Sequence, residues 1–142
     1  MKKAIGYRLF RLGRIPPRWR DRLQAEGIRL LDEGIRCTIT YRNYRAPGRY
    51  FAWRRSMGSG AIVLTHRRFS VFYYRWLVLN VELADPQLER IGISSPAPGV
   101  LVIAFDASDF DLNRSGSVAI RLWTSGAPNL LRVLSANRPI RS

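Results

Sequence analysis

The stretch Gly58–Tyr74, GSGAIVLTHRRFSVFYY, decides the fold of this chain. Apolar and aromatic side chains alternate with other residues on both sides of a short basic turn at Thr65–Arg67. The alternating positions are Ile62, Leu64, Phe69, Val71 and Tyr73. Because successive side chains of a strand point to opposite faces, this period of two predicts two β-strands joined as a hairpin. We expect the neighbouring segments to add strands to the same sheet.

Two helical segments are expected before this sheet. Segment 2–14 places apolar residues on one side of a helical wheel and basic residues on the other. Such a segment either lies on an anionic bilayer or docks on the core of its own domain. Pro16 and Pro17 suit the first turn of a second helix, which we expect to run to Glu33 and to stop at Gly34.

Strict alternation of apolar and polar residues follows the second helix. The range Ile35–Arg42 predicts a half-buried strand with Cys37 on its apolar face, as a small core residue. A turn at Arg45–Arg49 leads to a second strand, Tyr50–Ser56. Gly58–Gly60 is expected to loosen the chain before the central hairpin.

The second half of the chain repeats short apolar runs between turns. We expect strands at Leu77–Leu83, Leu88–Ser94, Val100–Phe105 and Ser117–Thr124, then a helix that Ser125 caps and that buries Leu130, Leu131, Val133 and Leu134. About seven strands at this spacing are typical of an all-β barrel or sandwich. The fold class expected is therefore mainly β, with a C-terminal helix and a helical N-terminal extension.

The excess of positive over negative charge lies entirely in the first half of the chain. The 142 residues carry a net charge of +14, and 46% of them are hydrophobic, which suits one domain with its own core. Residues 1–75 hold 18 Lys and Arg against 4 Asp and Glu, whereas residues 76–142 hold 6 against 6. A G+C-rich genome explains the preference for Arg over Lys, but it does not explain this asymmetry. An anionic partner does.

The cellular location expected from composition is the cytoplasm. A single cysteine cannot form an internal disulfide, and no apolar run reaches the roughly 18 to 20 residues needed to cross a bilayer. The N-terminus also lacks the uninterrupted apolar core of a secretory signal. Any membrane contact is therefore expected to be peripheral, at the inner membrane face.

The order of these elements resembles the pleckstrin-homology-like (PH-like) superfold, which has seven antiparallel strands and one C-terminal helix. Within the central hairpin, GAIVLTHRRF is similar to the apolar-Leu-Thr-x-x-Arg-aromatic signature of GRAM and bacterial PH-like domains. Leu64, Thr65 and Arg68 carry this similarity. The resemblance covers residues 35–136, so that 1–34 becomes a basic helical extension and 137–142 a tail.

This resemblance implies a non-catalytic binding module without a cofactor. In lipid-binding PH domains the basic residues cluster around the first two strands and their loop, which correspond here to Arg42, Arg45, Arg49, Arg54 and Arg55. Arg67 and Arg68 on the central hairpin complete the candidate anion-binding set. We expect this set to engage membrane headgroups or a protein partner. An exposed strand edge is expected to offer a route to oligomers.

Single-stranded nucleic acid is the alternative partner. Aromatic residues are interleaved with the basic residues of the first half, so phosphate contacts and base stacking could combine. These aromatic residues are Tyr41, Tyr44, Tyr50, Phe51 and Trp53. Their alternating positions are equally compatible with the core, and no RNP, KH or zinc-knuckle pattern is present.

Catalysis and metal binding are not expected from the residues available. His66 is the one histidine of the chain, and it falls at a hairpin tip where a solvated turn residue is the default. The carboxylates with the closest spacing are Asp106, Asp109 and Asp111. Their pattern departs from an EF-hand loop, since Arg114 replaces the required Gly and Ile120 the bidentate Glu. Calcium remains the alternative to a polar turn there.

Overall fold

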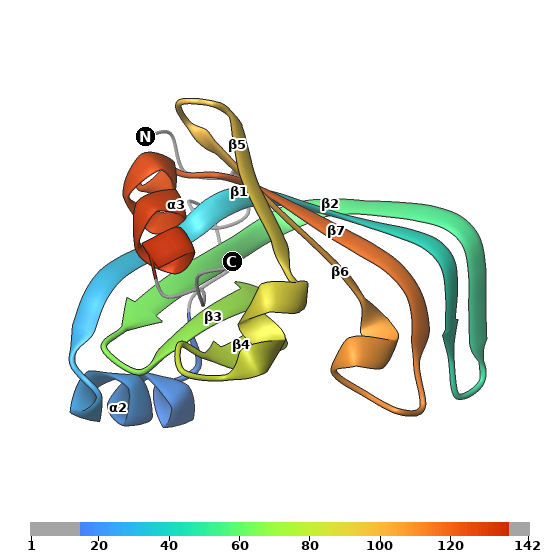
Figure 1. The fold of residues 1–142 in the computed structure, drawn as a ribbon, viewed down its shortest axis with the longest axis horizontal. Coiled ribbons are helices and arrows are strands. Elements are labelled where there is room, and N and C mark those ends of the chain that lie inside the picture. Colours follow the sequence, from blue (N-terminus) through green and yellow to red (C-terminus); the bar gives the residue numbers. More distant parts are fainter. Residues whose placement is uncertain (1–14, 137–142) are drawn as a thin grey trace, which may run out of the picture.

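The computed structural model describes residues 15–136, which form one open antiparallel β-sheet with two α-helices packed on it (Figure 1). The strands are β1 (Ile28–Ala46), β2 (Arg49–Thr65), β3 (Arg68–Tyr73), β4 (Trp76–Glu82), β5 (Gly92–Ala97), β6 (Val100–Asp106) and β7 (Ser115–Trp123). The helices are α2 (Pro17–Ala25) and α3 (Ala127–Ala136), with 3-10 turns η1 (Pro86–Arg90) and η2 (Ala107–Asp109). The expected mainly β fold with a C-terminal helix is confirmed.

The seven strands lie in the order β4-β3-β2-β1-β7-β6-β5, and every neighbouring pair is antiparallel. β4 and β5 form the two edges, so the sheet is open rather than closed into a barrel. Pro96 lies in the edge strand β5, where a residue without an N–H removes no internal hydrogen bond. The predicted hairpin turn at residues 65–67 is confirmed between β2 and β3.

The expected second helix is too long. It begins at Pro17 as expected but ends at Ala25 instead of Glu33. Gly27 has a φ of +81°. This backbone conformation ends a helix, and residues other than glycine rarely adopt it. The chain then enters β1 at Ile28, so residues 28–34 belong to the sheet and not to a helical extension.

Gly58–Gly60 does not interrupt the strands, because β2 runs without a break from Arg49 to Thr65. These glycines instead make room for neighbouring rings and backbone. A Cβ at Gly58 would lie 2.3 Å from the hydroxyl oxygen of Tyr74, and one at Gly60 would lie 2.7 Å from the carbonyl oxygen of Phe72. The expected break between the strand Tyr50–Ser56 and the first strand of the central hairpin was therefore wrong, because both belong to β2.

The later strands follow the expected pattern with one change. Val100–Asp106 and Ser115–Trp123 are strands as expected, but Pro86–Arg90 forms a 3-10 turn, so the strand expected from Leu88 begins at Gly92. The side chain of Asp85 starts this turn by accepting a hydrogen bond from the backbone N–H of Gln87. Segment 2–14 and the tail 137–142 lie outside the described residues.

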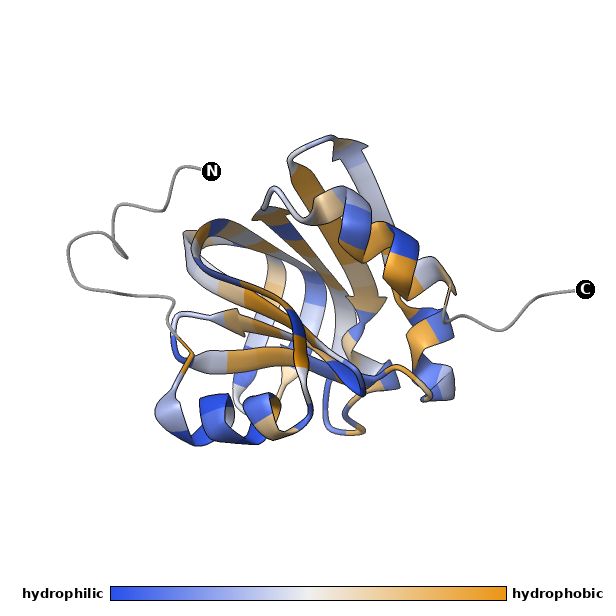
Figure 2. Cartoon of the chain, turned by 90° about the vertical axis from the view of Figure 1, so that its left-hand side faces the viewer, coloured by the Kyte–Doolittle hydropathy of each residue, from blue (hydrophilic) through white to orange (hydrophobic). Residues whose placement is uncertain are grey.

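Both sides of the sheet are covered at the end that carries the helices. The main core lies on the concave side, where Leu130 and Leu134 of α3 pack against the buried residues of the strands. A smaller core lies on the opposite side, where Leu23 of α2 packs with Val63 and Phe72. Figure 2 shows α2 at the bottom of the view in mostly hydrophilic colours, because Leu23 is the one fully buried side chain of this helix.

The β1–β2 hairpin extends beyond these helices. Its tip lies at the far end of the molecule from α2 and α3, beside the turn that joins β6 to β7 (Figure 1).

Neither helix among residues 15–136 combines the length and apolar character that a membrane-spanning helix requires.

A change of Gly60 to Ala tests the close approach of β2 and β3. The added methyl group would press on the backbone of Phe72, which cannot rotate away, so we expect the free energy of unfolding to fall by about 1 to 3 kcal/mol. Gly99→Ala is the matched control, because a Cβ there meets nothing within 4 Å and should change stability by less than about 0.5 kcal/mol. Equal urea midpoints for the two variants would show that β2 is not packed this tightly.

Candidate anion-binding surfaces

The seven candidate arginines lie at two ends of β2. Arg42, Arg45, Arg49, Arg54 and Arg55 belong to the far part of the β1–β2 hairpin. Arg67 and Arg68 lie at the β2–β3 turn, at the opposite end of a 17-residue strand. The predicted set is therefore not one cluster.

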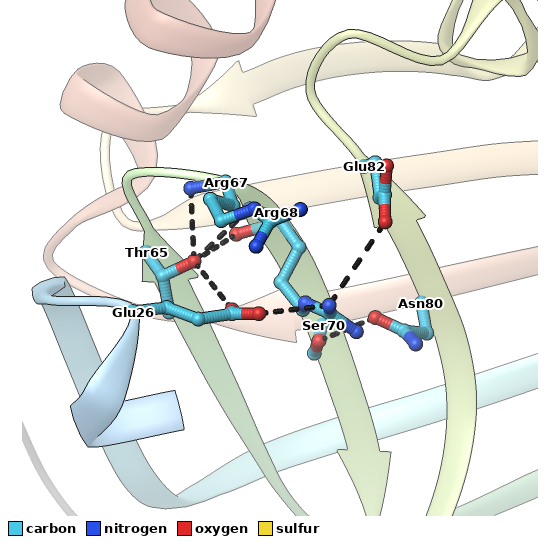
Figure 3. A network of polar contacts seen from close by, with 7 residues as sticks. All are labelled: Glu26, Thr65, Arg67, Arg68, Ser70, Asn80 and Glu82. Carbon is cyan, nitrogen blue, oxygen red and sulfur yellow. Dashed lines mark hydrogen bonds and ion pairs between the residues drawn. The ribbon is translucent and has the colours of Figure 1, made fainter. Parts of the chain in front are cut away.

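Arg68 is part of a polar network that joins α2 to the sheet (Figure 3). Its guanidinium group lies 2.8 Å from the carboxylate of Glu26 and 4.0 Å from that of Glu82. The hydroxyl of Thr65 donates to Glu26 and accepts the backbone N–H groups of Arg67 and Arg68, which fixes the turn. The Arg68 side chain is 12% exposed, so it stabilises the fold rather than facing a ligand. Arg67 is exposed beside it.

The five hairpin arginines are divided between the two sides of the sheet. We call the side away from the main core the outer face. It consists of Arg36, Thr38, Thr40 and Arg42 of β1, Trp53, Arg55 and Met57 of β2, and Ser117, Ala119, Arg121 and Trp123 of β7. Directly opposed residues such as Arg42 and Trp53, or Thr40 and Arg55, share a side in an antiparallel pair.

Ring contacts hold the arginines of the outer face in place. The guanidinium of Arg55 lies 5.4 Å from the ring centre of Trp53 and its Nε donates to the hydroxyl of Thr40. The guanidinium of Arg36 lies 4.7 Å from the ring centre of Trp123. Trp53 and Met57 remain 57% and 59% exposed. The outer face therefore combines oriented cations with exposed apolar groups.

Carboxylates are missing from this part of the sheet. The eleven positions named for the outer face include four arginines and no Asp or Glu, and Glu33, nearer to α2 on the same side, is paired with Arg20. Asp106 lies opposite Ser117 at the end of the next strand, β6, where it accepts hydrogen bonds from Ser108. The outer face is thus positively charged without internal neutralisation.

The concave side of the same hairpin lines a cavity of about 750 Å³, which we call the cavity. Its walls carry the rings of Tyr41, Tyr44, Tyr73, Tyr74, Phe105 and Phe110, and its floor is formed by core residues such as Ile39 and Ile120. Several of these rings touch one another. The centres of Tyr41 and Tyr44 are 4.8 Å apart, those of Tyr73 and Tyr74 are 4.7 Å apart and those of Phe105 and Phe110 are 5.2 Å apart.

Three arginines line the cavity together with this aromatic wall. Arg54 projects from β2 with its guanidinium 4.8 Å from the ring centre of Phe51, and Arg49 lies nearer the hairpin tip. Arg114, which the sequence analysis missed, donates to the hydroxyl of Tyr44 and pairs with Asp111 at 3.3 Å. Arg45, by contrast, lies over the exposed ring of Tyr50.

Unusual backbone conformations lie beside the cavity. Asn43 and Tyr74 are the two non-glycine residues with positive φ among residues 15–136, at +49° and +55°. The turn at Asn43 lets Tyr41 and Tyr44 line the same cavity although they are three positions apart. Such conformations cost free energy and concentrate at binding sites. Strand alternation alone could not predict this arrangement.

Burial shifts the pKa values of two tyrosines and of the cysteine. Burial, with a smaller effect of the neighbouring Tyr74, raises the pKa of Tyr73 to about 12. The pKa of Tyr41 is also raised, chiefly by burial. Cys37 is a core residue as predicted, and its burial raises the pKa of the thiol to about 12. These groups are therefore neutral at physiological pH.

The three carboxylates for which calcium was the alternative to a polar turn have separate partners. Asp106 binds Ser108, Asp109 pairs with Arg90 and Asp111 pairs with Arg114. In the described range, no three His, Cys, Asp or Glu side chains are grouped to hold a metal ion. His66 is exposed at the hairpin tip, and its backbone N–H donates to the carbonyl of Gly27.

Comparison with known proteins leaves the family open. Neither a protein-family model nor a curated protein sequence matches this chain.

Two carboxylates near Arg68 offer a matched test of its network. Glu26→Gln removes the close, buried partner, so we expect a loss of about 3 kcal/mol in the free energy of unfolding. Glu82→Gln removes a more distant carboxylate that is 55% exposed, and should cost less than about 1 kcal/mol. Urea denaturation measures both, and equal losses would contradict the structural role assigned to Glu26.

Alkaline pH should weaken the fold through Tyr73. Since its folded pKa is raised to about 12 from 10.0, the unfolded chain ionises first, and the stabilisation present below pH 10 is lost as the pH rises through 12. We therefore expect Tyr73→Phe to flatten the fall in urea stability between about pH 10 and 12. The same slope in both proteins would mean that Tyr73 titrates normally.

Proposed function

We propose that this chain is a non-catalytic, PH-like binding module that docks its outer face on an anionic membrane surface. The observation that carries the proposal is the placement of Arg36, Arg42, Arg55 and Arg121 with the exposed Trp53 on one side of the sheet. Each guanidinium can form paired hydrogen bonds to a phosphate, and tryptophan favours the headgroup boundary of bilayers.

The magnitudes favour weak, reversible binding. Four arginines at about 1 kcal/mol each give about 4 kcal/mol, which alone corresponds to a dissociation constant of about 1 mM. Burial of the exposed parts of Trp53 and Met57 among the headgroups must supply the remainder. Contact through one face of a sheet is peripheral by nature, in keeping with a cytoplasmic protein at the inner membrane face.

The PH-like assignment is supported by the seven antiparallel strands and by the helix that follows the last of them. Thr65 and Arg68, two of the residues that carry the sequence resemblance, both belong to the network that holds the β2–β3 turn. The resemblance thus bears on how the domain folds, while the ligand must be argued from the surface.

Nucleic acid remains the competing partner. Single-strand binding proteins stack successive bases on several aromatic rings. On the outer face, within the described residues, Trp53 is the one ring that is more than half exposed, because Trp123 lies beneath Arg36. Tyr41, Tyr44 and Phe51 pack against one another on the opposite side. The geometry therefore favours a membrane over a strand of bases.

Vesicle binding of paired variants tests the proposal. Arg42→Gln/Arg55→Gln should weaken binding to phosphatidylserine vesicles by about 2 kcal/mol, or about 30-fold, in a sedimentation assay at physiological salt. Arg67→Gln/Arg132→Gln removes the same charge from exposed positions outside the outer face and should leave binding within about threefold of the wild type.

Two outcomes would contradict the membrane proposal. Equal weakening in both double variants would mean that net charge, and not the outer face, drives adsorption. Tight binding of a single-stranded oligonucleotide with no vesicle binding at the same salt concentration would assign the surface to nucleic acid.

A further inference from the structure

The cavity has a composition that the membrane proposal does not use. Most of its lining is aliphatic or aromatic, and three arginines contribute to the same lining. We propose that the cavity binds a small amphiphilic carboxylic acid, with the apolar body against the aromatic walls and the carboxylate held by Arg49 and Arg54.

The size of the cavity suits such a ligand. A volume of about 750 Å³ falls within the range of about 300 to 1,000 Å³ that is typical of small-molecule sites. The apolar surface open to a ligand is supplied chiefly by rings that are only partly buried, namely Tyr41, Tyr73, Tyr74, Phe105 and Phe110. Ile39, Val118 and Ile120 behind them are almost fully covered. The polar groups lie mainly on β2 and on the segment that joins β6 to β7.

Charge selects an anion as the head of the ligand. Arg114 is already paired with Asp111, which neutralises it. Arg49 and Arg54 have no ion pair with any carboxylate among residues 15–136, which leaves two positive charges in the lining. Arg54 is held over the ring of Phe51, so its fork is oriented before a ligand arrives. A carboxylate matches that fork with two parallel hydrogen bonds.

The fold maintains the cavity at an energetic cost. Tyr74 adopts a positive φ and lays its ring against Gly58, a position where any side chain would collide with it. Asn43 adopts a positive φ beside Gly116, where a Cβ would lie 2.3 Å from the Asn43 carbonyl oxygen. Tyr74 itself lines the cavity and Asn43 precedes Tyr44 of the same lining, and strain of this kind is characteristic of binding sites.

This site is separate from the outer face. Arg54 and Arg55 are adjacent in β2, yet Arg54 lines the cavity and Arg55 lies over Trp53 on the other side of the sheet. Failure of one proposal therefore does not affect the other. Arg54 and Arg55 also provide matched variants, because they carry the same charge on the same strand but lie on opposite sides of the sheet.

A fluorescent fatty acid, 11-(dansylamino)undecanoic acid, serves as the probe for the full chain. We expect it to bind with increased fluorescence and to be displaced by decanoate at concentrations at least tenfold lower than those needed for 1-decanol, because the alcohol lacks the charge. Decyltrimethylammonium, with the same chain and the opposite charge, should not displace the probe.

Variants of the two neighbouring arginines assign the binding to the cavity. Arg54→Gln should weaken decanoate binding at least tenfold and leave that of 1-decanol unchanged, whereas Arg55→Gln should change neither. Ser56→Phe, which fills the space beside Arg54, should abolish binding of both chains while circular dichroism confirms the fold. Equal effects of Arg54→Gln and Arg55→Gln, equal displacement by decanoate and decanol, or no probe binding at all would each overturn the proposal.

Discussion

The pairing register of β1 with β2 determines what each arginine of the hairpin can contact. Tyr41 opposes Arg54, and this pair faces the cavity, whereas Arg42 opposes Trp53 and that pair faces outward. A slip of one residue would exchange the two sides, placing charge in the core and rings in solvent. The buried positions of Ile35, Cys37 and Ile39 prevent that slip, because their exposure would cost several kcal/mol.

The sequence was sufficient for those elements whose signal is local. Alternation predicted the central hairpin and the strand that contains Cys37, a continuous apolar run predicted the strand from Val100, and all are present. The helix after Pro17 was overextended because Leu30 and Leu31 continue the helical spacing of the apolar residues before them, although the strand begins at Ile28 and Gly27 marks the true end of the helix. Closure of the sheet depends on whether edge strands meet, which no single segment encodes.

The candidate site was predicted by composition but not by geometry. The arginines of the β1–β2 hairpin were correctly placed on neighbouring strands, yet two surfaces emerged where one was expected, since Arg54 and Arg55 point to opposite sides. Arg114 and Tyr74 come to the cavity from distant parts of the chain, with nothing in the surrounding sequence to signal it. Arg68 lies in a basic turn and was expected to bind an anion. Its side chain instead forms a buried ion pair with Glu26.

The assignment of neighbouring β2 residues to opposite sides of the sheet can be tested with nitroxide labels placed at Trp53, Arg54 and Arg55, one variant at a time. Cys37 should remain unlabelled, since burial raises the pKa of its thiol to about 12. On addition of phosphatidylserine vesicles, labels at 53 and 55 should lose contact with a water-soluble relaxation agent, while the label at 54 should keep it. Equal protection at all three positions, or protection at 54 alone, would contradict the register and the outward face derived from it.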